Sequence, residues 1–550
     1  MVVFLSLAWL RFTASALLRP VTHGLQSERV LIYGAGRAGT QLAAALTASG
    51  QYWPVGLVDD RKDLQGRLAA GLRVHSPDNL AVLRERLKFT RVLLAMPSAS
   101  MHRRADIVRG LESLSVKVMV MPGLDELACG SRQVGELRDV QVEDLLGREP
   151  VCPDTHLMDA FIKDKSVLIT GAGGSIGSEL ARQVLMRGAR RLVLFEMSEI
   201  ALYQIERELQ DLRARSEIST EIVAVLGTVL DKLGVERAML RHAVQTVYHA
   251  AAYKHVPLVE QNVLAGAQNN ILGTRVVVDA AVHCRLDNFV LVSSDKAVRP
   301  TSVMGATKRV QELIVQAAAH AAPEMRMSMV RFGNVLASSG SVVPLFREQI
   351  RKGGPVTVTH PEVTRYFMTI PEAAQLVIQA GAMGSRGDIF VLDMGEPVRI
   401  SDLARKMIHL SGYRPKEDAA GEGDIEVVYT GLRAGEKLYE ELLIDASAEP
   451  TSHPRIQKAQ EPCLTQAELT PILVSMSDAV SAERPQQVLT LLTTLVCGYV
   501  PTMQPVVQPL AEPAPPESQA VPIRRPAQKP SKHLVPTPIA DGGLMSASSS

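Results

Sequence analysis

The stretch Lys165-Ser-Val-Leu-Ile-Thr-Gly-Ala-Gly-Gly-Ser-Ile-Gly177 decides how this chain folds. Its first half is a short apolar run, which indicates a buried strand. Its second half has the spacing T-G-x-x-G-x-x-G and leads into a helix, so the backbone can approach a phosphate at a helix N-terminus. The pattern predicts a dinucleotide site formed by Thr170, Gly171, Gly174, Ser175, Ile176 and Gly177.

The strand that follows, Arg191-Leu-Val-Leu-Phe-Glu196, ends in an acid. A carboxylate at this place can accept a hydrogen bond from a ribose 2′-hydroxyl and would repel a 2′-phosphate. Glu196 therefore favours NAD over NADP, although a surface glutamate in a loop would give the same pattern.

Further apolar runs at residues 222–226, 246–252 and 289–292 alternate with helical segments. Strands that are buried on both faces and separated by helices predict an α/β fold with a doubly wound parallel sheet. Ala250 and Ala251 lie at the end of one such strand and are small enough to let a flat cofactor approach.

The run at 289–292 continues into Ser293-Ser-Asp-Lys296, and Lys308 follows on the next helix. The carboxyl end of a strand in a parallel sheet is where ligands bind. An acid, an amine and a hydroxyl placed there, here Asp295, Lys296 and Ser294, can transfer protons. A helix cap beside a solvated lysine would also fit this stretch.

A first Gly-rich turn precedes all of this. Gly34, Gly36 and Gly39 form G-x-G-x-x-G after an apolar strand, and Asp59 ends the next strand. With runs at 91–96 and 116–121, they predict a small Rossmann-like domain and a second nucleotide site at these four residues. The domain carries no acid–base cluster, so a fold that only regulates fits equally well.

The two ends of the chain differ from the rest. The first eighteen residues are apolar except for Arg11 and small hydroxyls, and they fall short of a complete membrane span. A membrane-surface helix, part of a membrane anchor and an ordinary amphipathic helix all fit, and membrane association is favoured. Residues 464–496 predict helix that packs on the enzyme or on a partner. Residues 501–550 hold 11 of the 32 prolines, which predicts a disordered tail.

These patterns divide the chain into five parts. They are a membrane-proximal segment at 1–26, a Rossmann-like domain at 27–150, a catalytic domain at 151–460, a helical extension at 461–500 and the tail. A smaller substrate-binding region is expected at about 337–455.

Composition excludes some classes of function. Lys and Arg number 59 against 58 Asp and Glu, so no basic surface indicates a nucleic-acid partner. The cysteines at 129, 152, 284, 463 and 497 form no C-x-x-C, which fits a reducing compartment and predicts no metal site.

Taken together, the motifs resemble the extended short-chain dehydrogenase/reductase superfamily, and within it the bacterial nucleotide-sugar 4,6-dehydratases of polysaccharide biosynthesis. The resemblance covers about residues 27–460. It rests on the Gly-rich turn at Thr170–Gly177 and on five further motifs. These are His249-Ala-Ala-Ala-Tyr-Lys-His-Val-Pro257, Ser293-Ser-Asp-Lys-Ala-Val-Arg-Pro300, Arg331-Phe-Gly-Asn-Val-Leu336, Thr364-Arg-Tyr-Phe-Met-Thr369 and Gly431-Leu-Arg-Ala-Gly-Glu-Lys437.

The chain departs from the superfamily at one place. The usual catalytic pair is Y-x-x-x-K, but this chain has Met304 four residues before Lys308. Methionine has no proton to exchange. The long dehydratases of this branch resemble the chain in this respect, so activity is expected, with Ser294, Lys308, a water or the nicotinamide ribose in place of the tyrosine.

The resemblance implies a reaction and roles for residues. NAD would take a hydride from C4 of UDP-N-acetylglucosamine and return it to C6. In between, Lys296 would remove the C5 proton and Asp295 would protonate the leaving C6 hydroxyl, which calls for a lysine of lowered pKa and a carboxyl of raised pKa. Lys308 would hold the nicotinamide ribose. Substrate contacts are implied for Lys254, Asn334, Arg365, Arg433 and Glu436.

The same resemblance implies a homo-oligomer at the bacterial inner membrane, with the catalytic domain in the cytoplasm and a product used for surface polysaccharide such as O-antigen or capsule. Two rival functions stay open. One is a nucleotide-sugar 4-epimerase or simple dehydrogenase, which needs no acid–base pair for C5 and C6. The other is a non-catalytic nucleotide-sugar sensor or scaffold.

Overall fold

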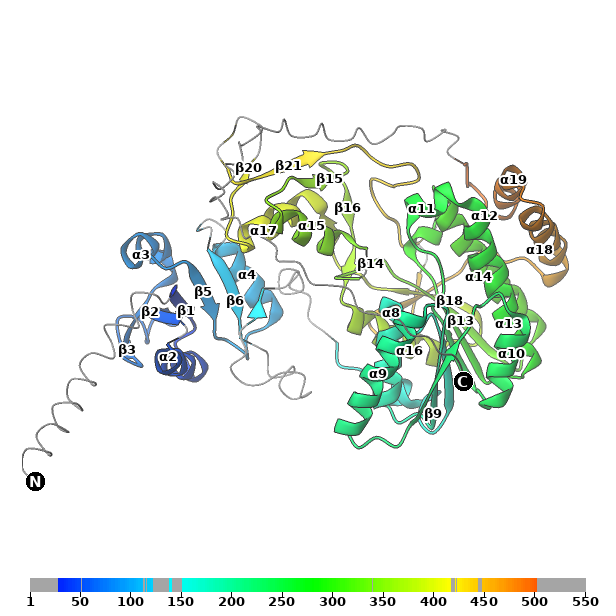
Figure 1. Cartoon of the computed structure of the whole chain (residues 1–550), viewed down its shortest axis with the longest axis horizontal. Coiled ribbons are helices and arrows are strands. Elements are labelled where there is room, and N and C mark those ends of the chain that lie inside the picture. The colour runs from blue at the N-terminus through cyan, green and yellow to red at the C-terminus, as the bar shows by residue number, and fades with distance from the viewer. Residues whose placement is uncertain are drawn as a thin grey trace, which may run out of the picture. The chain divides into compact units, whose positions relative to one another are not determined.

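The computed structural model describes residues 28–50, 52–111, 114, 116–121, 138–140, 151–338, 340–416, 421, 423–443 and 448–501 (Figure 1). The segment expected at 1–26 and residues 502–550 of the expected tail lie outside these residues. No helix in the described part of the chain has the length and apolarity needed to cross a membrane.

The N-terminal part forms a sheet with the order β3-β4-β2-β1-β5-β6-β7. Strands β4, β2, β1, β5 and β6 pair in parallel, and the edge strands β3 and β7 pair antiparallel. The bounds are β1 Glu28–Tyr33, β2 Tyr52–Val58, β3 Leu68–Ala69, β4 Leu72–His75, β5 Arg91–Leu94, β6 Lys117–Val120 and β7 Arg138–Asp139, with helices α2 Arg37–Ser49, α3 Leu80–Leu87 and α4 Met101–Leu111. The predicted Rossmann-like arrangement is confirmed.

The catalytic part is built on a nine-stranded sheet with the order β10-β9-β8-β11-β12-β13-β18-β23-β22. All neighbours from β10 to β18 are parallel, and β23 and β22 add antiparallel strands at the edge. The bounds are β8 Ser166–Thr170, β9 Arg191–Glu196, β10 Glu221–Leu226, β11 Thr246–His249, β12 Asn288–Val292, β13 Arg326–Arg331, β18 Arg386–Leu392, β22 Ala448–Pro450 and β23 Ile456–Ala459. Strand order reverses between β8 and β11, which opens a ligand crevice at their carboxyl ends.

Helices cover both faces of this sheet, as the doubly wound prediction requires (Figure 1). One face packs against α8 Ser175–Met186, α9 Glu199–Arg215 and α16 Ile370–Met383. The other packs against α10 Lys232–Arg241, α13 Gly273–His283 and α14 Val303–Ala321. Every residue of β8, β11 and β12 is buried, which explains why these strands appear in the sequence as apolar runs without alternation.

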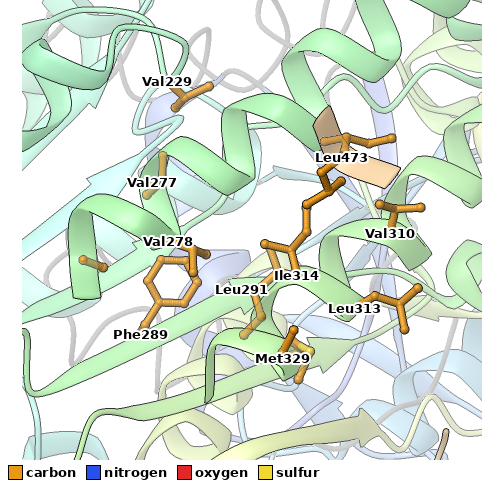
Figure 2. Close-up of a cluster of buried hydrophobic side chains, with 14 of the residues drawn as sticks. Val229, Val277, Val278, Phe289, Leu291, Val310, Leu313, Ile314, Met329 and Leu473 are labelled. Carbon is orange, nitrogen blue, oxygen red and sulfur yellow. The ribbon is translucent and has the colours of Figure 1, made fainter. Parts of the chain in front are cut away.

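The core beneath α13 and α14 is shown in Figure 2. Phe289 and Leu291 of β12 pack with Val278 of α13 and Ile314 of α14, and Leu473 joins them from the C-terminal helices. Those helices are α18 Gln466–Ser481 and α19 Pro485–Leu495, which contact α14. The helix predicted over 464–496 is therefore two helices that pack on the enzyme, and the second begins at a proline, which suits a first helical turn.

The predicted substrate-binding region forms small sheets beside the carboxyl ends of the large sheet. Its elements are β14 Asn334–Val335, β15 Val356–Val358, β16 Thr364–Arg365, β17 Phe367–Met368, β19 Val398–Arg399, β20 Pro415–Lys416 and β21 Ile425–Tyr429, with helices α15 Val342–Arg351 and α17 Ile400–Leu410. They share a core centred on Phe346, Leu403 and Ile408. Its members Leu336, Val363 and Phe367 flank the short strands β14 and β16, which carry Asn334 and Arg365.

Candidate active site

The Gly-rich turn after β8 needs glycine at two positions. A Cβ on Gly171, whose φ is +66°, would lie 2.8 Å from the backbone of Ala251. A Cβ on Gly177 would lie 2.0 Å from the carbonyl oxygen of Gly171. The turn therefore packs too closely against its own backbone and against Ala251, in the loop after β11, to hold a side chain at either position, and Gly174 caps the N-terminus of α8. The turn has the form that a bound diphosphate requires.

Not all of the predicted cofactor residues face open space. The buried Thr170 Oγ1 is 2.7 Å from His249 Nδ1 and joins β8 to β11. Ala251 donates its backbone N–H to Thr170 Oγ1 at 3.4 Å. Glu196 accepts hydrogen bonds from the backbone N–H of Gly173 at 3.0 Å and of Met197 at 2.9 Å, so its carboxylate is fixed beside the turn.

A cavity of about 660 Å³ opens beside this turn. The predicted residues that line it are Gly171, Gly174, Ser175, Ile176, Gly177, Ala250, Lys254, Ser294, Lys296, Met304, Lys308 and Asn334. The cavity therefore joins the Gly-rich turn to the polar residues after β12. Thr170, Glu196, Ala251 and Asp295 are not part of its lining.

The loop after β11 is held by Asn270, which lies in a π-helical turn at Ala267–Leu272. Asn270 accepts a hydrogen bond from the N–H of Tyr253 at 2.8 Å and donates one to its carbonyl at 3.0 Å. These two bonds fix the backbone immediately before Lys254, which lines both cavities of the site.

The acid–base residues lie at the carboxyl end of β12, as predicted. Asp295 is 1% exposed, and its Oδ1 accepts hydrogen bonds from Ser294 Oγ at 2.8 Å and from Lys296 Nζ at 3.0 Å. Lys296 Nζ also lies 2.7 Å from Glu440 Oε1. Three titratable groups therefore meet at one nitrogen.

The pKa values of Lys296 and Asp295 are shifted in the directions opposite to those expected for a base and an acid. Burial alone would lower the pKa of Lys296, but the charges of Asp295 and Glu440 raise it above its usual value. Burial alone would raise the pKa of Asp295, but the charge of Lys296 lowers it. The expected lowered lysine and raised carboxyl are therefore not this pair, because the two residues form an ion pair with each other.

The raised carboxyl is Glu440, which the sequence analysis did not single out. Burial and the nearby charge of Asp295 raise the pKa of Glu440 to about 7. Its Oε1 is 3.2 Å from Arg365 Nε, and its Oε2 accepts a hydrogen bond from Asn334 Nδ2 at 3.0 Å. The signal available in the sequence was weak: Glu440 follows the motif that ends at Lys437, in a loop far from β12.

The lowered lysine is Lys308. Its Nζ donates to the carbonyl oxygen of Val292 at 3.1 Å, and burial lowers its pKa to about 8. Met304 lies one helical turn earlier, is 2% exposed and lines the cavity. The position of the usual tyrosine is therefore an apolar wall.

A second cavity of about 240 Å³ lies on the other side of Lys296. Lys254, Arg365, Arg433 and Glu436 line it together with Glu440. Glu436 pairs with the guanidinium of Arg365, with 3.0 Å between its Oε1 and Arg365 Nη2, and its Oε2 accepts a hydrogen bond from the backbone N–H of Arg433 at 3.2 Å. Asn334, for which a substrate contact is predicted, contacts Lys296 and Glu440.

The predicted second nucleotide site also has a formed turn. A Cβ on Gly39 would lie 1.8 Å from the carbonyl oxygen of Gly34, while a Cβ on Gly36 would meet no atom within 4 Å. Asp59 accepts hydrogen bonds from the N–H groups of Ala35 at 2.7 Å and Arg61 at 2.9 Å. The four residues lie together, and a nucleotide there stays a prediction.

Comparison with known proteins adds a family. Residues 167–461 match the model of the family described as "Polysaccharide biosynthesis protein". The chain is 44% identical over 421 residues to the probable polysaccharide biosynthesis protein EpsC of Bacillus subtilis (strain 168), covering 76% of this chain and 68% of that protein. It is 42% identical over 428 residues to the capsular polysaccharide biosynthesis protein CapD of Staphylococcus aureus, covering 77% and 70%.

A third relative bears a different name. The chain is 32% identical over 283 residues to the UDP-glucose 4-epimerase of Rickettsia rickettsii (strain Sheila Smith), covering 51% of this chain and 78% of that protein. This match covers about half of the chain, and the relative is named for epimerisation at C4 of a nucleotide sugar.

Proposed function

The chain belongs to the polysaccharide biosynthesis protein family, and from this premise we propose that it is an NAD-dependent nucleotide-sugar 4,6-dehydratase. Its substrate is UDP-N-acetylglucosamine and its product is UDP-2-acetamido-2,6-dideoxy-4-hexulose, a precursor of bacterial surface polysaccharide. The observation that carries this proposal is the contact of Ser294, Asp295 and Lys296 at the carboxyl end of β12, between the two cavities.

The fit of NAD rests on the first cavity. The Gly-rich turn presents backbone at Gly171, where no side chain fits, and Glu196 stands beside the turn where a 2′-phosphate would be repelled. Lys308 lines the same cavity and would hold the nicotinamide ribose. When bound there, NAD accepts a hydride from C4 of the sugar and supplies it to C6.

The uridine diphosphate part of the substrate is assigned to the second cavity. Arg365 and Arg433 carry guanidinium groups that suit bidentate contacts with phosphate, and Lys254 adds a further cation. Glu436 orients the guanidinium of Arg365 and holds the backbone at Arg433. This arrangement supports a substrate whose sugar points toward Lys296, which lines both cavities.

Ser294 is proposed to replace the missing tyrosine. Its Oγ donates to Asp295 Oδ1 at 2.8 Å and it lines the first cavity, so the hydroxyl can receive the proton of the C4 hydroxyl while its own proton passes to Asp295. Lys296 then removes the C5 proton, and Asp295 gives its proton to the leaving C6 hydroxyl, which departs as water.

The 4-epimerase is the second candidate, favoured by the Rickettsia relative. An epimerase returns the hydride to C4 and has no use for an acid and a base at C5 and C6, the roles proposed here for Asp295 and Lys296. We also propose attachment to the cytoplasmic face of the bacterial inner membrane, for which the apolar composition of residues 1–26 is the support.

The proposal is tested by incubating the purified chain with UDP-N-acetylglucosamine and NAD and following the sugar nucleotide by mass spectrometry. Loss of one water from the sugar, abolished by Lys296→Ala, is the expected result. A product of unchanged mass with inverted C4 by NMR would favour the epimerase instead.

A further inference from the structure

Glu440 occupies a position that the proposed reaction has not yet used. Its side chain is 4% exposed and lies against Lys296, Arg365 and Asn334, and the carboxylate of Asp295 is close enough for its charge to raise the Glu440 pKa. The shortest of these contacts, 2.7 Å, is to Lys296 Nζ. A carboxylate buried this deeply is retained at a cost, since charges are poorly solvated inside a protein.

Lys296 must lose a proton before it can act as a base. Its Nζ has three acceptors within hydrogen-bond distance in the described residues: Asp295 Oδ1, Glu440 Oε1 and Asn334 Oδ1. An amide oxygen does not take up a proton near neutral pH. Asp295 must itself carry the proton that goes to the C6 hydroxyl. Glu440 is the acceptor that is left.

We propose that Glu440 is the proton acceptor for Lys296, storing the lysine's proton while the neutral amine acts on the substrate. This inference rests on the proposed dehydratase function and assigns a role to a residue that does not touch the reacting atoms. Glu440 is therefore a positioning and proton-storing residue, while Lys296 stays the catalytic base.

The protons balance over one cycle. The C4 hydroxyl proton reaches Asp295 through Ser294, and Lys296 gives its own proton to Glu440. The C5–H bond then breaks toward Lys296 Nζ, its electron pair forms the C5=C6 bond, and the C6–O bond breaks as Asp295 protonates the departing oxygen. After the hydride that left C4 has been added at C6, Lys296 returns its proton to C5 and Glu440 returns the stored proton to Lys296.

The surroundings of Glu440 suit this role. Burial and the charge of Asp295 raise the pKa of Glu440 to about 7, so the carboxyl can take up and release a proton near neutral pH. Protonation of Asp295 also removes an anion that holds Lys296 charged. Burial, the larger cause of the raised Glu440 pKa, persists when Asp295 is protonated, so burial and the loss of the Asp295 anion beside Lys296 favour the transfer across the 2.7 Å contact.

The test compares Glu440→Gln with Glu441→Gln. Glutamine keeps an oxygen for Asn334 but cannot store a proton, whereas Glu441, which contacts Arg299 and Lys437 at the surface, serves as the matched control. The keto sugars are trapped by reduction with borodeuteride, so that a 4-ketone that retains its C6 hydroxyl can be distinguished from one that has lost it. Exchange at C5 is followed in D₂O.

In E440Q the 4-ketone with its C6 hydroxyl is expected to accumulate, with C5 exchange and water loss slowed about 100-fold or more at unchanged KM. Wild-type kcat is expected to fall as pH falls through about 7, because Glu440 must begin as a carboxylate. E440Q loses this dependence, and E440D, which keeps a carboxyl, restores part of it.

Two results would overturn the inference while leaving the dehydratase intact. One is elimination of water from the sugar in E440Q at the same rate, and with the same pH dependence, as in E441Q. The other is a uniform loss of C4 oxidation and water elimination in E440Q with an unchanged pH profile, which indicates a purely structural role. A wild-type chain that oxidises no sugar nucleotide would overturn the proposed function, and the inference with it.

Discussion

At the scale of single residues, the pKa values of the two lysines of the site are shifted in opposite directions by their surroundings. Lys296 touches two carboxylates, which keep its amine charged. Lys308 is buried against a backbone carbonyl, with the charge of Glu312 as a weaker opposing influence, so burial lowers its pKa. Two lysines therefore serve two purposes in one cavity: Lys296 is the proposed base, and Lys308 is a cation that titrates with pH.

The lowered pKa of Lys308 predicts a pH dependence of stability. In the folded chain its pKa is about 8, against ~10.4 when unfolded, so the unfolded chain binds more protons between these values and stability rises with pH across that window. Urea unfolding of wild type and Lys308→Met at about pH 7.5 and about pH 9.5 measures this. The wild type should gain stability relative to the variant at the higher pH, and a constant difference would contradict the assignment.

Residue-scale chemistry was only partly predictable from the sequence. Ser294, Asp295 and Lys296 are adjacent and end a strand, so their meeting needed no tertiary information. Glu440 reaches Lys296 only because the loop after β21 folds back over the carboxyl end of β12. The direction of each pKa shift depends on such contacts, which is why the sequence could not predict that the pKa of Lys296 is raised, that of Asp295 lowered and that of Glu440 raised.

At the scale of elements, the turn between β8 and α8 places the site. Its glycines are required by close backbone contacts as well as by the ligand, which is why a sequence pattern alone could identify it. The prediction of the strands succeeded for the same reason: β8, β11 and β12 are buried along their whole length, and burial on both faces removes polar residues from the sequence.

Gly177→Ala tests the turn. The added methyl would lie 2.0 Å from the carbonyl oxygen of Gly171, so the turn must open, and NAD affinity should fall at least tenfold, or ~1.4 kcal/mol. Calorimetric titration with NAD measures this. Gly110→Ala, at an open position within α4, is the control and should bind NAD as wild type does. Equal affinity in G177A would show that the turn does not hold the cofactor.

Two substitutions in α18 test whether the C-terminal helices pack on the enzyme. Leu473 of α18 is 4% exposed and packs beside Ile314, whereas its neighbour Val474 is 47% exposed (Figure 2). Leu473→Ala should lower the free energy of unfolding by about 2–5 kcal/mol, because it leaves a cavity. Val474→Ala should change it by less than ~0.5 kcal/mol. Equal effects in chemical denaturation would mean that α18 does not pack on α14.

At the scale of the whole molecule, the chain combines a doubly wound catalytic sheet with a substrate-binding region, and the acid–base cluster lies between their two cavities. Periodicity and glycine spacing could predict the sheets and their order of elements. They could not predict which segments of the substrate-binding region meet β12, since Arg433 and Glu440 lie in irregular segments and Arg365 in a two-residue strand, none of which has a repeating pattern.

The most direct test of the central claim follows the hydrogen at C4. UDP-N-acetylglucosamine carrying deuterium at C4 is incubated with the chain and NAD, and the product is analysed by NMR and mass spectrometry. A 4,6-dehydratase moves that deuterium to C6 while the sugar loses one water. Deuterium that returns to C4 of an inverted sugar, with the C6 hydroxyl still present, would contradict the account and identify an epimerase.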